Sequence, residues 1–226
     1  MTHKETLLAQ HLSKFVSDHK KDFMDRVLNE RTRHITIVLE NIYQSQNASA
    51  ALRTCECMGV QDVHIIENTA KYELNIRVLK GSDKWLDLIR YRNKGVNNTE
   101  TCFRNLREKG YRIFVADPAE GGVSINDLDV QGKVALLFGN ELRGASEYAL
   151  AQADGKIRIP MVGFTESLNI SVSVAICLNT VLQKIKQLEH PVLLTQDEKD
   201  RLKLRWLKKM VKRSDLLERE FLRTIE

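Results

Sequence analysis

Apolar residues form two alternating patterns along the middle of the chain. Short, β-branched apolar runs predict strands, and they lie at residues 34–40, 62–67, 111–117, 133–139 and 156–160. Between them the apolar positions follow helical spacing, at residues 47–59, 98–109, 146–153 and 169–188. Strands that alternate with helices predict an α/β fold with a mostly parallel sheet covered by helices on both faces.

The two ends of the chain follow only the helical pattern. Residues 1–33 predict two short amphipathic helices, and a last helix is expected to begin near Thr195, where Thr195 and Glu198 have the spacing of a capping box. In the middle, Asn47 or Ser49 is the expected N-cap of its helix. We therefore predict three parts: an N-terminal helical extension at 1–34, an α/β domain at 35–190 and a C-terminal helical extension at 195–226.

Positive charge is concentrated at the same two ends. Residues 1–34 contain seven Lys or Arg against five acids, and residues 195–226 contain ten against seven. The remaining residues carry eighteen of each sign, so the net charge of +5 lies entirely in the ends. This distribution indicates a polyanionic partner such as nucleic acid, with two ordinary solvated helices as the alternative.

The four cysteines do not have the spacing of a metal site. No pair forms a C-x-x-C motif, and no histidine stands near one at ligand spacing. We expect reduced, mostly buried thiols in an intracellular, cytoplasmic protein, and no metal. The first residues are too polar for a signal peptide, and the longest apolar stretch, near 170–182, is interrupted by Ser and Asn and too short to span a membrane.

The segment "LLFGNELRGAS" (136–146) resembles a phosphate-binding loop without its lysine. Ala145 stands where the lysine would be, and Glu141 would repel a phosphate, so a nucleotide-binding protein is disfavoured. What remains is a strand end whose glycines allow close backbone approach, at the edge of a sheet where α/β proteins bind ligands. An ordinary turn between strand and helix is the alternative.

Two further segments contain polar residues at helix starts. In "QNASAALRT" (46–54), Asn47 precedes Arg53 by six residues, and the alternative for Arg53 is a surface arginine. In "IPMVGFTESLNISVSVA" (159–175), Ser167 and Asn169 open a helix of small residues, and simple helix capping is the alternative.

Together, the order and spacing of these three segments resemble the signature motifs of the SPOUT (SpoU–TrmD) RNA methyltransferases, over about residues 35–185. The TrmH branch, which methylates ribose 2'-hydroxyls, is the most similar. The segment "GSDKW" (81–85) and the basic end helices resemble its tRNA guanosine-18 enzymes. The resemblance implies an α/β fold with a deep trefoil knot, a homodimer, S-adenosylmethionine as cofactor and tRNA as partner.

The resemblance also implies which residues form the site. Catalytic roles fall on Arg53, Asn47, Glu141, Ser167 and Asn169. Cofactor contacts fall on Asp117, Gly139, Ile159, Met161 and Leu168. RNA contacts are expected at Arg31, Arg33, Lys84, Arg143, Arg205, Lys208 and Lys209. Because a guanidinium stays protonated, we interpret Arg53 as an electrostatic partner of the reacting oxygen rather than a base, with Glu141 fixing it by paired hydrogen bonds.

Three alternatives to a tRNA guanosine methyltransferase follow from the same residues. One is a ribosomal RNA ribose 2'-O-methyltransferase, and another is an RNA-binding relative that has lost catalysis. The intact set of catalytic residues argues against the second. The third is a nucleotide-binding protein that uses residues 139–146, which the missing lysine disfavours. Separately, the basic amphipathic stretch "RLKLRWLKKMVKR" (201–213) could lie on a membrane surface.

Overall fold

The computed structural model describes residues 1–119 and 121–225. The chain divides into two compact units. One consists of Met1–Arg31 together with Leu193–Glu226, and the other of Thr32–Val192. We call them the terminal unit and the sheet unit.

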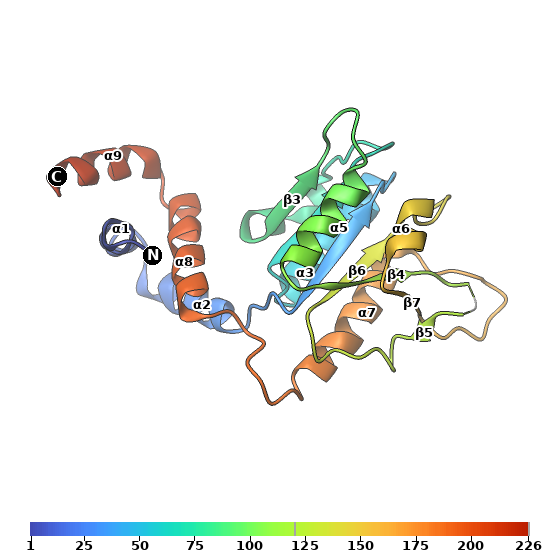
Figure 1. Cartoon of the computed structure of the whole chain (residues 1–226). Coiled ribbons are helices and arrows are strands. Elements are labelled where there is room, and N and C mark those ends of the chain that lie inside the picture. The colour runs from blue at the N-terminus through green and yellow to red at the C-terminus, as the bar shows by residue number, and fades with distance from the viewer. Residues whose placement is uncertain (120, 226) are drawn as a thin grey trace. The chain divides into compact units, whose positions relative to one another are not determined.

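The sheet unit is built around a seven-stranded sheet in which all pairs of the described strands are parallel (Figure 1). The strand order is β3-β2-β1-β6-β4-β7-β5. The strands are β1 (Ile35–Glu40), β2 (Asp62–Ile66), β3 (Asp87–Tyr91), β4 (Arg112–Ala116), β5 (Val123–Ser124), β6 (Val134–Phe138) and β7 (Gly155–Arg158). The predicted parallel α/β fold is confirmed, and all five predicted strands form.

Helices cover both faces of the sheet. Helices α3 (Ser45–Cys57) and α7 (Ile170–Ile185) pack on one face, and α5 (Asn98–Glu108) and α6 (Glu147–Gln152) pack on the other. Side chains of β1 alternate between the two cores, with Ile37 in the first and Val38 in the second, as the pleat requires. The short helix α4 (Ile76–Leu79) and a 3₁₀ turn η1 (Ser82–Trp85) lead into β3.

Strands β3 and β5 were not predicted from the sequence. Strand β3 lies at the edge of the sheet, where its residues are mostly half-buried, and the sequence "DLIRY" mixes charged and apolar residues without alternation. Strand β5 has only two residues. A short edge strand does not need the continuous apolar run that identifies a central one. The trefoil knot implied by the resemblance stays a prediction.

The terminal unit contains α1 (His3–Ser13), α2 (Asp18–Asn29), α8 (Gln196–Met210) and α9 (Ser214–Thr224). The two predicted N-terminal helices and the capping box of Thr195 and Glu198 are confirmed. The predicted last helix ends at Met210, and Arg213, with a φ of 55°, turns the chain into α9. The core is apolar and includes Leu8, Leu12, Met24, Leu28, Leu202, Trp206 and Leu207.

The four cysteines are free thiols, and three of them are buried. Among the described residues, no helix has the length and apolar character needed to cross a membrane. Over the same residues, no three His, Cys, Asp or Glu side chains cluster as metal ligands would.

Candidate active site

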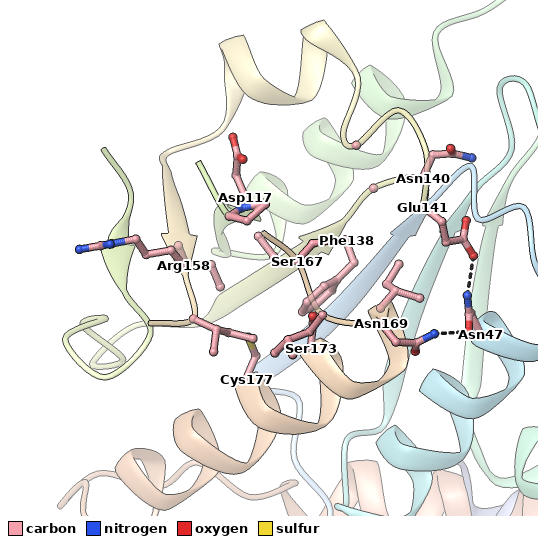
Figure 2. A pocket seen from close by; sticks show the side chains of 18 of the residues that line it. Asn47, Asp117, Phe138, Asn140, Glu141, Arg158, Ser167, Asn169, Ser173 and Cys177 are labelled. Carbon is pink, nitrogen blue, oxygen red and sulfur yellow. Dashed lines mark hydrogen bonds between the residues drawn. The ribbon is translucent and has the colours of Figure 1, made fainter. Parts of the chain in front are cut away.

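A cavity of about 480 Å³ opens at the carboxyl ends of β4, β6 and β7, beside the first turns of α3 and α7 (Figure 2). This is the edge of a parallel sheet where ligands usually bind. Apolar side chains of Phe138, Ile157 and Ile170 form much of its wall. All five residues predicted to contact a cofactor line it: Asp117, Gly139, Ile159, Met161 and Leu168. Three separate parts of the sequence therefore meet around one hollow.

A chain of hydrogen bonds joins the three predicted motifs at the mouth of this cavity. The Asn47 amide nitrogen donates to Glu141 Oε1 over 3.0 Å, and Asn47 Oδ1 accepts from the Asn169 amide nitrogen over 3.0 Å (Figure 2). Asn169 Oδ1 in turn accepts from the Ser171 backbone and caps α7. These two hydrogen bonds hold the Asn47 amide in one orientation, and the residue is only 8% exposed.

Glu141 also caps helix α3. Its carboxylate accepts the backbone N–H groups of Tyr43 (3.0 Å) and Gln44 (3.2 Å). Burial acts to raise the pKa of Glu141, but the hydrogen bonds from Asn47 and these backbone groups outweigh it, so the pKa lies below its ordinary value. The predicted N-cap at Asn47 or Ser49 is wrong: α3 begins at Ser45, with Gln44 as its N-cap residue, and Glu141 binds the Gln44 N–H.

Arg53 lies away from the cavity. It is exposed on α3, and its side chain makes no hydrogen bond or ion pair with any other described residue. Six residues of α-helix separate it from Asn47 by about 9 Å along the axis. The expected pairing of Arg53 with Glu141 is wrong within one chain, since the acceptor positions of Glu141 face the N-terminus of α3. The other four predicted catalytic residues line the cavity, Ser167 with an exposed side chain.

The loop from Gly139 to Ser146 folds back on itself. Asn140 and Gly144 exchange two backbone hydrogen bonds of 2.9 Å each, and Asn140 Oδ1 accepts the Leu142 N–H. A Cβ on Gly139 would lie 2.2 Å from the Ala145 nitrogen, which leaves no room for a side chain. The loop therefore requires glycine at position 139 because its own backbone turns back against this residue. A ligand that approaches the backbone there would add a second reason.

Glu40, which the sequence reasoning missed, fixes the far end of this loop. Its side chain is 1% exposed, and its carboxylate accepts the Ser146 N–H and hydroxyl, each over 2.8 Å, and the Thr99 hydroxyl. A buried carboxylate needs such donors to offset its lost hydration. An acid at the last position of an otherwise apolar strand was the available signal.

Asp117 follows β4 and is anchored by its neighbours. Its carboxylate pairs with Lys156 Nζ over 2.8 Å and accepts the Ala119 N–H over 3.0 Å. The hydrogen bond from Lys156, more than any other contact, holds the pKa of Asp117 below its ordinary value. The side chain thus stays ionised at the rim of the cavity.

The structure contradicts two of the predicted RNA contacts. Arg31 is 1% exposed, and its guanidinium lies 5.4 Å from the centre of the Trp206 ring in the core of the terminal unit. Arg33 bonds Asp62 (2.9 Å) and Asp87 (2.8 Å), which neutralise it. Neither side chain is placed to meet a phosphate.

The other predicted RNA contacts lie at the surface to different degrees. Lys208 is half-buried and pairs with Glu218 over 2.6 Å, which reduces its availability. The remaining four side chains are exposed: Lys84, Arg143, Arg205 and Lys209.

Comparison with known proteins identifies the same region. The SpoU rRNA Methylase family matches residues 34–179. A tRNA (guanosine(18)-2'-O)-methyltransferase of Borreliella burgdorferi is 40% identical over 92% of this chain and 93% of its own length. The crystal structure of the A. aeolicus TrmH/SpoU tRNA modifying enzyme has a TM-score of 0.75 and 26% identity, over 86% of this chain and 98% of that one. AviRb of Streptomyces viridochromogenes, in complex with AdoMet, shares the fold with a TM-score of 0.60 and 21% identity, over 72% and 62%.

Proposed function

The chain belongs to the SpoU rRNA Methylase family. We propose that it transfers a methyl group from S-adenosylmethionine to the ribose 2'-hydroxyl of a tRNA guanosine, at tRNA position 18 in the D-loop. One observation carries the proposal: Asn47, Glu141 and Asn169, from three distant motifs, are hydrogen-bonded around one cavity. The relative with this activity that is 40% identical over most of both chains supports the same substrate.

The cavity suits the cofactor in size and chemistry. Its volume of about 480 Å³ is within the range of small-molecule sites, which combine apolar walls with a few polar groups. Ile159, Met161 and Leu168 offer apolar contact, while Asp117 and the backbone at Gly139 offer polar contact. When bound, S-adenosylmethionine supplies a methyl group that its sulfonium already activates.

The protein's own residues then have to align the ribose and stabilise the attacking oxygen. Ser167 and Asn169 lie at the cavity and can hydrogen-bond ribose hydroxyls. The hydrogen bond between Asn47 and Glu141 holds the start of α3 against the loop after β6. Such alignment supplies much of the rate enhancement when the donor is already activated. Loss of the 2'-hydroxyl proton to solvent leaves negative charge on the attacking oxygen, which calls for a cation, and we assign Arg53 to that role.

Arg53 can fill this role if a second copy of the chain supplies it. Beside the cavity, the segment that leads into α7 exposes large apolar side chains, with Val162 and Phe164 fully exposed and Leu168 and Val172 partly so. Several large apolar side chains that are exposed within one short segment favour an interface there. We propose a homodimer in which Arg53 of one copy completes the cavity of the other.

Mixing two inactive variants tests this arrangement. Arg53→Ala lacks the cation, and Asn169→Ala lacks the cavity amide, so each homodimer should be inactive. In a dimer of one variant with the other, one of the two sites would have both residues. We therefore expect each mixed dimer to have up to half of the activity of a wild-type dimer. Activity that never returns on mixing would exclude a site shared between copies.

Methyl transfer itself is tested with labelled S-adenosylmethionine and unmodified tRNA transcripts. We expect one methyl group per tRNA, located by nuclease digestion and mass spectrometry on the ribose of a D-loop guanosine. Ribosomal RNA fragments serve as the competing substrate, and faster methylation of these would favour the ribosomal alternative. Absence of methylation with both, although S-adenosylmethionine binds, would favour the RNA-binding relative.

We further propose that the helices of the terminal unit, within 1–34 and 195–226, bind tRNA while residues 35–190 carry out the chemistry. The exposed basic side chains of Arg205 and Lys209 on α8 support this assignment. Contacts of this kind hold the phosphate backbone without reading its sequence. A tRNA substrate and free thiols favour a cytoplasmic protein.

A further inference from the structure

A second cavity, of about 740 Å³, adjoins the proposed cofactor cavity, and Gln44 lines both. We propose that it holds the base of the nucleotide whose ribose is methylated, with Tyr43 as a stacking surface and Gln46 reading the base edge. We call it the base cavity, and the inference rests on the proposed function. Its lining residues are Tyr43, Gln44, Ser45, Gln46, Thr69, Ala70, Lys71 and Glu73.

The two walls of the base cavity are tied together at both ends. Asn41 Oδ1 accepts the backbone N–H groups of Asn68 (2.8 Å) and Thr69 (2.9 Å). At the other end, the Asn75 N–H donates to Ser49 Oγ over 2.9 Å. The segment between residues 69 and 75 is thus held against the start of α3, and the cavity is a built feature of the sheet unit.

Tyr43 presents an exposed ring on an anchored backbone. The residue is 73% exposed, yet its backbone N–H donates to Glu141, which also contacts Asn47 at the cofactor cavity. An exposed ring on an anchored backbone loses little conformational freedom on binding. Proteins that bind unpaired RNA bases commonly stack them on such rings.

The polar lining suits a base better than a phosphate. Lys71 and Glu73 offset each other, and the other polar groups are neutral amides and hydroxyls. Gln46 is exposed, and its amide makes no hydrogen bond to another described residue. A side-chain amide offers one donor group and one acceptor side by side, which can pair with O6 and N1–H of guanine.

Truncating the ring tests the stacking role. Tyr43→Ala keeps the backbone N–H that Glu141 binds, so the rest of the site stays in place. We expect the KM for an unmodified tRNA transcript to rise roughly 5- to 100-fold, as for loss of one stacked base, with an unchanged Kd for S-adenosylmethionine. Tyr43→Phe, the matched control, keeps the ring and should stay within about twofold of wild type.

Changing the base tests the role of Gln46. Transcripts carry guanosine, inosine or adenosine at the methylated position, and inosine retains both O6 and N1–H. The wild type should accept inosine as well as guanosine, and Gln46→Ala should lose at least about tenfold of kcat/KM with both, as expected when a hydrogen-bonding base contact is removed, whereas its effect with adenosine should be smaller.

Three outcomes would overturn the inference. If the wild type is active but Tyr43→Ala has an unchanged KM for tRNA, the ring does not stack on the substrate. If Tyr43→Ala instead dissociates a dimer, measured by light scattering, the cavity belongs to an interface between copies. If the wild type methylates no RNA at all, the proposed function fails, and this inference fails with it.

Discussion

At the scale of single residues, the Glu141 carboxylate accepts three hydrogen bonds that a substitution would weaken. A carboxyl whose pKa is lowered by folding stabilises the protein above its unfolded pKa, and the contribution is lost as the pH falls through the folded value. For Glu141 this window lies below about pH 4.5, the ordinary value of a glutamate. We expect Glu141→Gln to lower the free energy of unfolding at pH 7 by about 1 kcal/mol, as for loss of a helix cap.

Urea unfolding at pH 7 and near pH 3.5 measures both parts of this prediction. The difference between wild type and Glu141→Gln should shrink at the lower pH, because the contribution of the ionised carboxylate is lost progressively below the ordinary pKa of a glutamate. Glu166→Gln, at an exposed glutamate, is the control and should leave stability unchanged at both pH values. Equal stability of wild type and Glu141→Gln at pH 7 would contradict the capping role.

Gly139 is a second residue whose change should be costly. Its Cβ would collide with the backbone of Gly144 and Ala145, which cannot rotate away as a side chain could. We expect Gly139→Ala to lower the free energy of unfolding by about 2 kcal/mol and to weaken S-adenosylmethionine binding. Gly163→Ala is the matched control, because its nearest neighbour would be 4.0 Å away. Thermal unfolding compares the stabilities of the two variants, and calorimetry compares their binding of S-adenosylmethionine. Similar stabilities would contradict the close approach of Gly139 to the backbone of Ala145.

At the scale of secondary-structure elements, Arg33 joins the beginnings of β2 and β3. Asp62 and Asp87 are both largely buried, and burial raises the pKa of Asp62 although Arg33 lowers it. Removing the arginine would leave these carboxylates without their cation. We expect Arg33→Met to lower the free energy of unfolding by about 3 kcal/mol.

The control for Arg33 is another arginine with a more exposed partner. Arg112 pairs with Asp129, and the two side chains are 40% and 58% exposed. Exposed pairs contribute less than about 1 kcal/mol, so Arg112→Met should be much milder. Chemical denaturation measures the free energy of unfolding of both variants. If Arg33→Met loses no more of it than Arg112→Met, the ion pairs of Arg33 do not stabilise the sheet.

How far sequence could predict these elements depended on the range of the interactions. Central strands such as β6, five buried residues in a row, were evident because their environment is apolar throughout. The start of α3 was missed because its cap, Glu141, lies almost a hundred residues away in the sequence. Arg31 was misassigned to RNA because only folding places it against Trp206. Local patterns located the cavity residues, while long-range partners decided what each one does.

At the scale of the whole molecule, the uneven charge predicts a salt-dependent affinity for tRNA. Each phosphate contact contributes a slope of roughly 0.7 to 0.9 to the fall of log affinity with log salt concentration. The double variant Arg205→Ala/Lys209→Ala removes two exposed cations of α8. We expect it to weaken tRNA binding and to reduce the slope by about 1.5, with S-adenosylmethionine affinity unchanged.

The matched control removes two exposed lysines from the sheet unit. Lys109 and Lys133 lie just before β4 and β6, at the amino edge of the sheet, opposite the proposed site. Filter binding from low to high salt should give the double variant Lys109→Ala/Lys133→Ala nearly the wild-type slope, because the loss of net charge is the same but no phosphate contact is removed. Equal slopes in both double variants would mean that total charge, and not the terminal helices, attracts the RNA.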